Sequence, residues 1–227
     1  TTTGILNSID SFSELGEKYG HTLILDAISS YAGVPIDLEA TPIDYLMSTS
    51  NKCIQGMPGL AYIIGNKSKL VQLKNWPTRS FYLSLYDQYD YMEKSGQMRF
   101  TPPVQVIYAL RKAIDELQHE TIEVRYSRYS QSWRTLIDGM DKLGFKQYVP
   151  LEYQSKLICT FYEPDNFNFN DFHDYLYKRD ITIYPGKILN KKTFRIGTIG
   201  DINYNDIEHL LKYIKEYQSE CAEKKKK

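Results

Sequence analysis

Asp26 and Lys52 are the residues whose chemical types and positions point most clearly to a reaction. Each lies in or just after a short apolar run, in the sequences LILDAISSYAG and MSTSNKCIQGMPG. Such runs predict buried strands, so both side chains are expected to project from the ends of neighbouring strands into one crevice. A lysine amine there can form an imine with an aldehyde, and a carboxylate can keep a pyridine nitrogen protonated. The pair therefore favours an enzyme that uses pyridoxal phosphate.

Charge and cysteine content argue against several other kinds of function. The 227 residues contain 28 Lys plus Arg and 28 Asp plus Glu, so no overall field attracts nucleic acid or a membrane surface. The 3 cysteines are widely separated and fit neither a disulfide framework nor a zinc site. No apolar stretch is long enough to span a membrane. We therefore expect a globular cytoplasmic protein without a metal, nucleic-acid or membrane partner.

The first part of the chain alternates between helical and strand patterns. Apolar residues recur at helical spacing over 9–19, and Gly20 is expected to end this helix. Short apolar runs predict three strands of an α/β sheet, at 22–28, 43–47 and 59–64. The segment 76–100 is rich in Tyr, Ser, Asp and Gln and has little periodicity. It is predicted to be either a long exposed loop or a surface that another subunit covers.

Two long helices are expected next. One begins at the TPP sequence of 101–103, and the other runs from about Thr121 to Leu143 and ends at Gly144. The length of the second helix suits a connector between domains.

Beyond Pro150 the pattern changes to that of a small β-α-β-β-α domain. Its elements are expected at 156–162, 170–179, 181–184, 193–197 and 205–222. We therefore expect an α/β protein in which residues 1–148 belong to a large domain with a mixed or parallel sheet. Residues 149–227 would form the small α/β domain, which ends in a basic tail at 224–227.

Five sequence blocks, in chain order, carry a resemblance to a known family: TTTGILN, DAISSYAGVPID, NKCIQGMPG, FTPPV and FRIGTIGD. The chain resembles the 2-aminoethylphosphonate:pyruvate aminotransferases, which are class V aminotransferases of fold type I. The resemblance covers nearly the whole chain, and NKCIQGMPG is its most specific part. It implies a homodimer that uses pyridoxal phosphate to transfer the amino group of 2-aminoethylphosphonate to pyruvate, giving phosphonoacetaldehyde and L-alanine.

The resemblance also implies roles for individual residues. Lys52 matches the lysine that forms the imine and moves the substrate proton, and Asp26 matches the partner of the pyridinium nitrogen. Arg195 matches the arginine that binds the substrate anion, since a planar guanidinium can hold a carboxylate or phosphonate through two parallel hydrogen bonds. The family positions that contact the cofactor are Thr1, Ile28, Asn51 and Thr101, the last of which serves the phosphate of the neighbouring subunit.

One departure from the family pattern concerns the cofactor phosphate. Family members hold it partly on a Gly/Ser/Thr turn at a helix N-terminus and stack a residue on the ring, and both features lie upstream of the family position of Thr1. We therefore expect this chain to be the C-terminal portion of such an enzyme and to hold the cofactor weakly by itself.

Other functions remain open from the sequence. An alanine:glyoxylate or serine:pyruvate transaminase shares Asp26, Lys52 and Arg195, and a noncatalytic oligomerisation module derived from such an enzyme would form no cofactor imine. Cysteine desulfurase chemistry is disfavoured, because it needs a mobile thiol and Cys53 lies next to Lys52 at a strand end. Cys53 is expected to be a small packing residue.

Overall fold

The computed structural model describes residues 2–224 and divides into two compact units. The lysine unit comprises residues 8–31 and 36–119, and the arginine unit comprises the described residues of 1–7, 32–35 and 120–227. Each unit has its own sheet of three strands. None of the helices between residues 2 and 224 has the length and apolar character needed to cross a bilayer.

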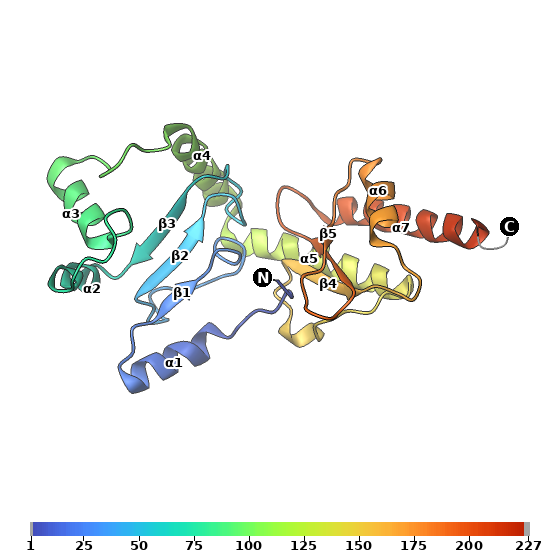
Figure 1. Ribbon diagram of the computed structural model, residues 1–227, viewed down its shortest axis with the longest axis horizontal. Helices are drawn as coiled ribbons and strands as arrows, with labels where there is room; N and C mark the ends of the chain where they lie inside the picture. The colour runs from blue at the N-terminus through green and yellow to red at the C-terminus, as the bar shows by residue number, and fades with distance from the viewer. Residues whose placement is uncertain (1, 225–227) are drawn as a thin grey trace. The chain divides into compact units, whose positions relative to one another are not determined.

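The sheet of the lysine unit contains the three expected strands in the order β1-β2-β3 (Figure 1). They span Ile24–Asp26, Tyr45–Thr49 and Ala61–Gly65. β1 runs parallel to β2, with Asp26 opposite Met47, and β3 runs antiparallel to β2. The expectation of a buried strand is wrong for β1, where Ile24 is 58% exposed, because β1 is an edge strand of this sheet.

Side-chain caps begin three helices of the lysine unit, and glycines end two of them. They are α1 Ile9–Tyr19, α2 Lys67–Gln72 and α3 Leu85–Ser95, followed by α4, which spans Val104–Glu120; a 3-10 turn spans Leu73–Asn75. The prediction for α1 is confirmed: the Ser8 hydroxyl accepts a hydrogen bond from the Ser11 amide, and Gly20 ends the helix with φ of 65°.

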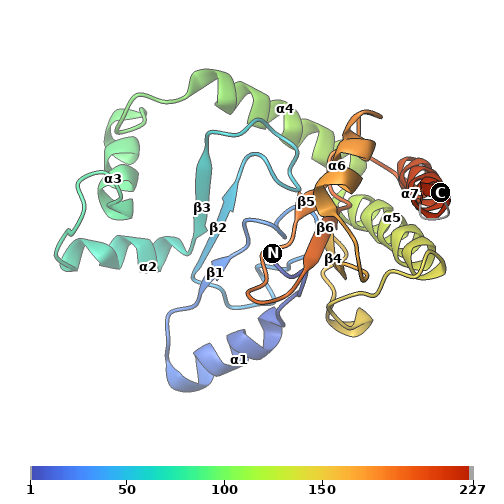
Figure 2. The same ribbon diagram turned by 45° about the vertical axis from the view of Figure 1, so that its right-hand side comes forward.

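Of the two alternatives for 76–100, the long exposed loop is wrong for the central part of the segment, which forms α3 next to α2 (Figure 2). Ser84 caps its first turn by accepting a hydrogen bond from the Asp87 amide, and Gly96 ends it with φ of 68°. Asp90 and Lys94 form an ion pair of 2.6 Å along its surface. Caps and surface pairs thus stabilise a helix whose apolar residues show no clear stripe.

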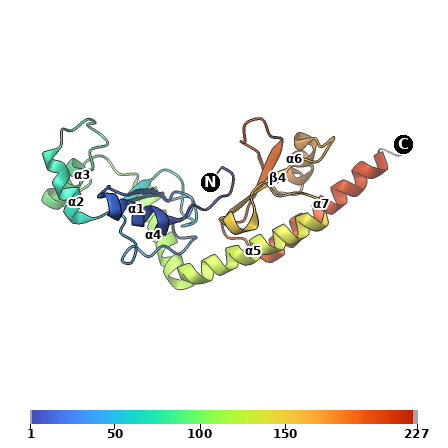
Figure 3. The ribbon, with the colours of Figure 1, turned by 90° about the horizontal axis from the view of Figure 1, so that it is seen from below.

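The arginine unit has a sheet of order β4-β6-β5, in which both strand pairs are antiparallel. The β-α-β-β-α prediction is confirmed, with strands β4 Ile158–Tyr162, β5 Tyr184–Pro185 and β6 Thr193–Gly197 and helices α6 Phe169–Tyr177 and α7 Tyr204–Lys224. The preceding long helix, α5, spans Ile122–Lys142 and packs along α7 on the same side of β4 (Figure 3), and a 3-10 turn spans Leu151–Tyr153.

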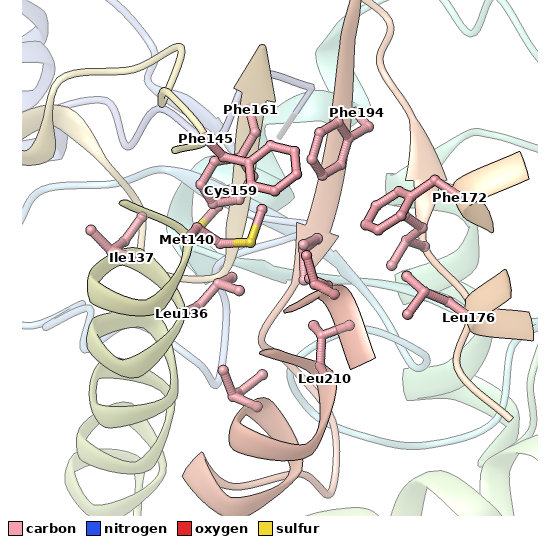
Figure 4. Close-up of a cluster of buried hydrophobic side chains, with 14 of the residues drawn as sticks. Leu136, Ile137, Met140, Phe145, Cys159, Phe161, Phe172, Leu176, Phe194 and Leu210 are labelled. Atoms are coloured by element: carbon pink, nitrogen blue, oxygen red, sulfur yellow. The ribbon is translucent and has the colours of Figure 1, made fainter. Parts of the chain in front are cut away.

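Alternate residues of β4 and β6 separate two faces of this sheet. Cys159, Phe161, Phe194 and Ile196 point into the core with side chains of α5, α6 and α7 (Figure 4). Since neighbouring residues of a strand point to opposite faces, Thr160 and Arg195 lie on the other face. The core side therefore fixes the position of the strand that carries Arg195.

Candidate active site

Asp26 and Lys52 follow the carboxyl ends of two strands that lie side by side. Asp26 is the last residue of β1, and Lys52 lies in the turn that follows the end of β2 at Thr49. Because β1 and β2 are parallel, both strands end at the same edge of the sheet. The structure thus brings these two residues to one edge, where open α/β sheets usually bind their ligands.

Hydrogen bonds join the two turns behind these side chains. The Cys53 thiol donates to the Ser29 carbonyl at 3.2 Å, and the Ser48 hydroxyl donates to the Ala27 carbonyl at 3.5 Å. The Ala27 amide donates to the Met47 carbonyl at 3.0 Å. Cys53 is therefore more than the packing residue expected from the sequence, because its thiol links the two strand ends.

The Asp26 carboxylate is exposed, and only one of its two oxygens accepts a hydrogen bond within the described chain. Its Oδ1 accepts a hydrogen bond from the Ile28 amide at 3.0 Å, and Oδ2 has no hydrogen-bond partner in the described part of the chain. Lys52 is half-buried and forms no ion pair with any residue between 2 and 224. An amine and a carboxylate oxygen are both available at this edge.

The turn that carries Lys52 is compact for reasons visible in its sequence. The Ser50 hydroxyl donates to the Met57 carbonyl at 2.5 Å, and the Gln55 amide donates to the Lys52 carbonyl at 2.8 Å. A Cβ atom on Gly56 would lie 2.6 Å from the Ser50 carbonyl oxygen, so only glycine fits there without a backbone shift. These contacts fix the backbone from which Lys52 extends.

Two of the other predicted cofactor residues, Ile28 and Asn51, lie next to this pair in the sequence, whereas Thr101 lies farther along the chain. Ile28 supplies the amide that binds Asp26, and the exposed Asn51 accepts a hydrogen bond from the Thr49 hydroxyl at 3.0 Å. Thr101 is exposed and precedes α4 in the same unit. Thr1 lies outside the described residues.

Arg195 lies in β6, the central strand of the arginine unit, and is 9% exposed. Its Nε donates to the Pro185 carbonyl at 3.1 Å, and no Asp or Glu of the described chain forms an ion pair with it. A buried guanidinium without a carboxylate partner is costly unless another anion binds it. Its surroundings therefore suit a binding site for an anionic ligand.

An ion-pair cluster missed by the sequence reasoning holds the loop that follows β6. Arg128 donates from Nε to Glu120 at 2.8 Å and from Nη1 to the Gly200 and Ile202 carbonyls at 2.8 and 2.7 Å. Arg125 donates to the same carboxylate at 2.6 Å. Partial burial raises the pKa of the Glu120 carboxyl, but the hydrogen bonds from Arg128 and Arg125 outweigh it, so the pKa lies below its usual value.

Known proteins share both the sequence and the fold of this chain. A curated 2-aminoethylphosphonate–pyruvate transaminase of Phocaeicola vulgatus is 44% identical over 95% of this chain and 60% of that protein. The enzyme of the same name from Lactiplantibacillus plantarum is 43% identical over 96% of this chain and 60% of that protein. The chain therefore spans about 60% of the length of these relatives.

The solved structures that resemble the chain confirm the predicted fold type I. An alanine–glyoxylate aminotransferase from Nostoc sp. superposes with a TM-score of 0.86 at 23% identity, over 95% of this chain and 58% of that one. A ureidoglycine–glyoxylate aminotransferase from Bacillus subtilis gives a TM-score of 0.83 at 20% identity, over 93% of this chain and 56% of that one. The sequence model of the class-V aminotransferases matches residues 1–202. This chain belongs to the class-V aminotransferase family.

Proposed function

We propose that this chain supplies the lysine, the cofactor carboxylate and the substrate arginine of a 2-aminoethylphosphonate:pyruvate aminotransferase. The observation that carries the proposal is the presence of Asp26 and Lys52 at one edge of the β1-β2 pair. Support for the substrate pair comes from relatives of that name that are 42–44% identical over 93–96% of the chain. The products are phosphonoacetaldehyde and L-alanine.

The side chains at this edge fit pyridoxal phosphate. When bound, this cofactor supplies an electron sink for negative charge that develops on the substrate carbon. Lys52 offers the amine that attaches to an aldehyde, and Asp26 offers the carboxylate oxygen that the Ile28 amide does not use. Ile28 and Asn51 are proposed to contact the cofactor beside them.

Lys52, Asp26 and Arg195 have separate roles in this reaction. Lys52, once its amine is free, takes the proton from the substrate carbon and returns it as a general base and acid. Asp26 favours a protonated ring nitrogen, because a nearby negative charge stabilises the positive form. Arg195 binds the phosphonate of the amino donor and the carboxylate of pyruvate in turn, which requires an arginine without a carboxylate partner of its own.

A second subunit is part of the proposal. The Thr101 hydroxyl is proposed to bind the cofactor phosphate of the neighbouring subunit in a homodimer. Thr1 is proposed to line the cofactor site. The segment 76–100 exposes Trp76, Phe81 and Leu83, which suits a surface that another subunit covers. Residues 1–148 are proposed to belong to the cofactor-binding domain and residues 149–227 to the small domain.

The decisive experiment compares cofactor binding by the wild type and Lys52→Ala. Both are prepared as the 227-residue chain and as a completed protein, in which this chain is joined to the part of the Phocaeicola vulgatus relative that it does not cover. We expect the absorption band of lysine-bound cofactor in the wild type and in the control Lys74→Ala, and no such band in Lys52→Ala. Absence of the band from every preparation would support a noncatalytic module instead.

Amine-donor assays then test the substrate. Transfer from 2-aminoethylphosphonate to pyruvate, with little transfer from serine or from alanine to glyoxylate, is the expected result. The reverse preference would identify an alanine:glyoxylate or serine:pyruvate transaminase and overturn the proposed substrate.

A further inference from the structure

Tyr184 lies directly opposite Arg195 in the antiparallel pair of β5 and β6. Residues in this register point to the same face of the sheet, with Cβ atoms about 5 Å apart. The Arg195 Nε donates to the carbonyl of Pro185, the residue after Tyr184, at 3.1 Å. The guanidinium therefore extends toward β5, on the side where the tyrosine lies.

The Tyr184 hydroxyl is available for a ligand. The side chain is 53% exposed, and its phenol makes no hydrogen bond to any residue between 2 and 224. The other hydroxyl directly opposite Arg195 belongs to Thr160 of β4. Thr160 is buried and donates to the Thr3 carbonyl at 2.9 Å, so its proton is already used. Of the two hydroxyls directly opposite Arg195, the one on Tyr184 is therefore the one that remains available to an anion.

We propose that Tyr184 is a second anion-binding residue that makes this site prefer a phosphonate to a carboxylate. The inference rests on the proposed function of Arg195. A carboxylate has two oxygens, and a guanidinium held in two parallel hydrogen bonds engages both. A phosphonate has three oxygens, so one remains after the guanidinium is satisfied. The phenol donates its proton to that third oxygen.

This arrangement predicts an asymmetric effect of removing one hydroxyl. A hydrogen bond to a charged group is among the stronger ones in proteins, and a partner left without it loses affinity. Tyr184→Phe keeps the aromatic ring and its packing but removes the donor. Binding of the phosphonate is therefore weakened, while binding of the carboxylate is retained.

The test measures binding of two unreactive probes that differ only in their head group, ethylphosphonate and propionate. Dissociation constants are determined by calorimetry for the wild type, Tyr184→Phe and Tyr162→Phe, in the preparation that carries out the transamination. Tyr162 is a matched control, because it lies on the same face of the sheet as Arg195 but opposite Thr193, and its ring is tilted against that of Tyr148. Tyr184→Phe should weaken ethylphosphonate about tenfold or more and leave propionate within about twofold.

Each other outcome counts against a specific claim. Unchanged ethylphosphonate binding in Tyr184→Phe would overturn the role of Tyr184 and leave the proposed function intact. Equal weakening of both probes, or equal effects of Tyr184→Phe and Tyr162→Phe, would indicate a general disturbance of the sheet and also overturn it. If no wild-type preparation transfers the amino group of 2-aminoethylphosphonate, the proposed function fails, and this inference fails with it.

Discussion

The thiol of Cys53 lies 3.2 Å from the carbonyl oxygen of Ser29 and donates a hydrogen bond to it. The bond runs from the turn that carries Lys52 to the turn that follows Asp26. Backbone pairing between β1 and β2 ends at the pair Asp26 and Met47, so it includes Asp26 but stops before Lys52. The position of the amine relative to the carboxylate therefore depends on side-chain bonds such as this one.

Cys53→Ala should lower both stability and cofactor affinity. It removes a buried hydrogen bond and leaves a small void where the thiol is 0% exposed, for a loss of about 1–2 kcal/mol in the free energy of unfolding. Urea unfolding and the dissociation constant of pyridoxal phosphate measure the two effects. Cys53→Ser, which keeps a donor, should retain more cofactor affinity than Cys53→Ala. Identical behaviour of all three proteins would show that the thiol does not link the turns.

Arg195 should give no stability to the wild type in anion-free buffer, and an anion that binds to it should stabilise the protein. Arg195→Met replaces a buried cation that has no carboxylate partner in the described chain, so the free energy of unfolding should stay level or rise in anion-free buffer. Ethylphosphonate should then raise the Tm of the wild type but not of Arg195→Met, because only a ligand of the native state stabilises it. An equal rise in both proteins would place anion binding elsewhere.

Glu120 should make stability depend on pH in the acid range. Its folded-state pKa lies below its unfolded value, so its contribution is fully present above the unfolded pKa of about 4 and is lost as pH falls through the folded pKa. Glu120→Gln should therefore lower the free energy of unfolding by about 3 kcal/mol at pH 7, since Arg125 and Arg128 lose this carboxylate. The difference from wild type should shrink below pH 4. A difference independent of pH would contradict the role assigned to the charge.

The sequence alone predicted the parts of the site that depend on local pattern. Apolar runs with polar residues after them located Asp26 and Lys52 at strand ends, and β1 and β2 are indeed parallel neighbours. The helix α1 was predicted from its spacing and from Gly20. In α3 the periodicity was obscured by tyrosines and charged residues, although Ser84 and Gly96 were usable capping signals.

Contacts between side chains and distant backbone carbonyls could not be predicted from the sequence. Arg128 binds the carbonyls of Gly200 and Ile202, and Cys53 binds that of Ser29. A carbonyl is present in every residue, so no residue type marks the acceptor. The exposure of Ile24 was also hidden, because an apolar run does not reveal whether its strand lies at the edge of a sheet.

Gly56 should be the glycine of the lysine turn that least tolerates a side chain. A Cβ atom would lie 2.6 Å from the Ser50 carbonyl oxygen, a backbone atom that cannot rotate away, so Gly56→Ala must displace the turn. We expect a loss of about 1–3 kcal/mol in the free energy of unfolding and weaker cofactor binding, measured by urea unfolding and cofactor titration. Gly16→Ala, in α1, is the matched control, because the nearest atom to its Cβ would be the His21 carbonyl oxygen at an ordinary contact distance of 3.7 Å. Alanine there favours the helix and should add about 0.5–1 kcal/mol without changing cofactor affinity. If Gly56→Ala were as stable as Gly16→Ala, the turn would not be held against Ser50, and the placement of Lys52 would need another explanation.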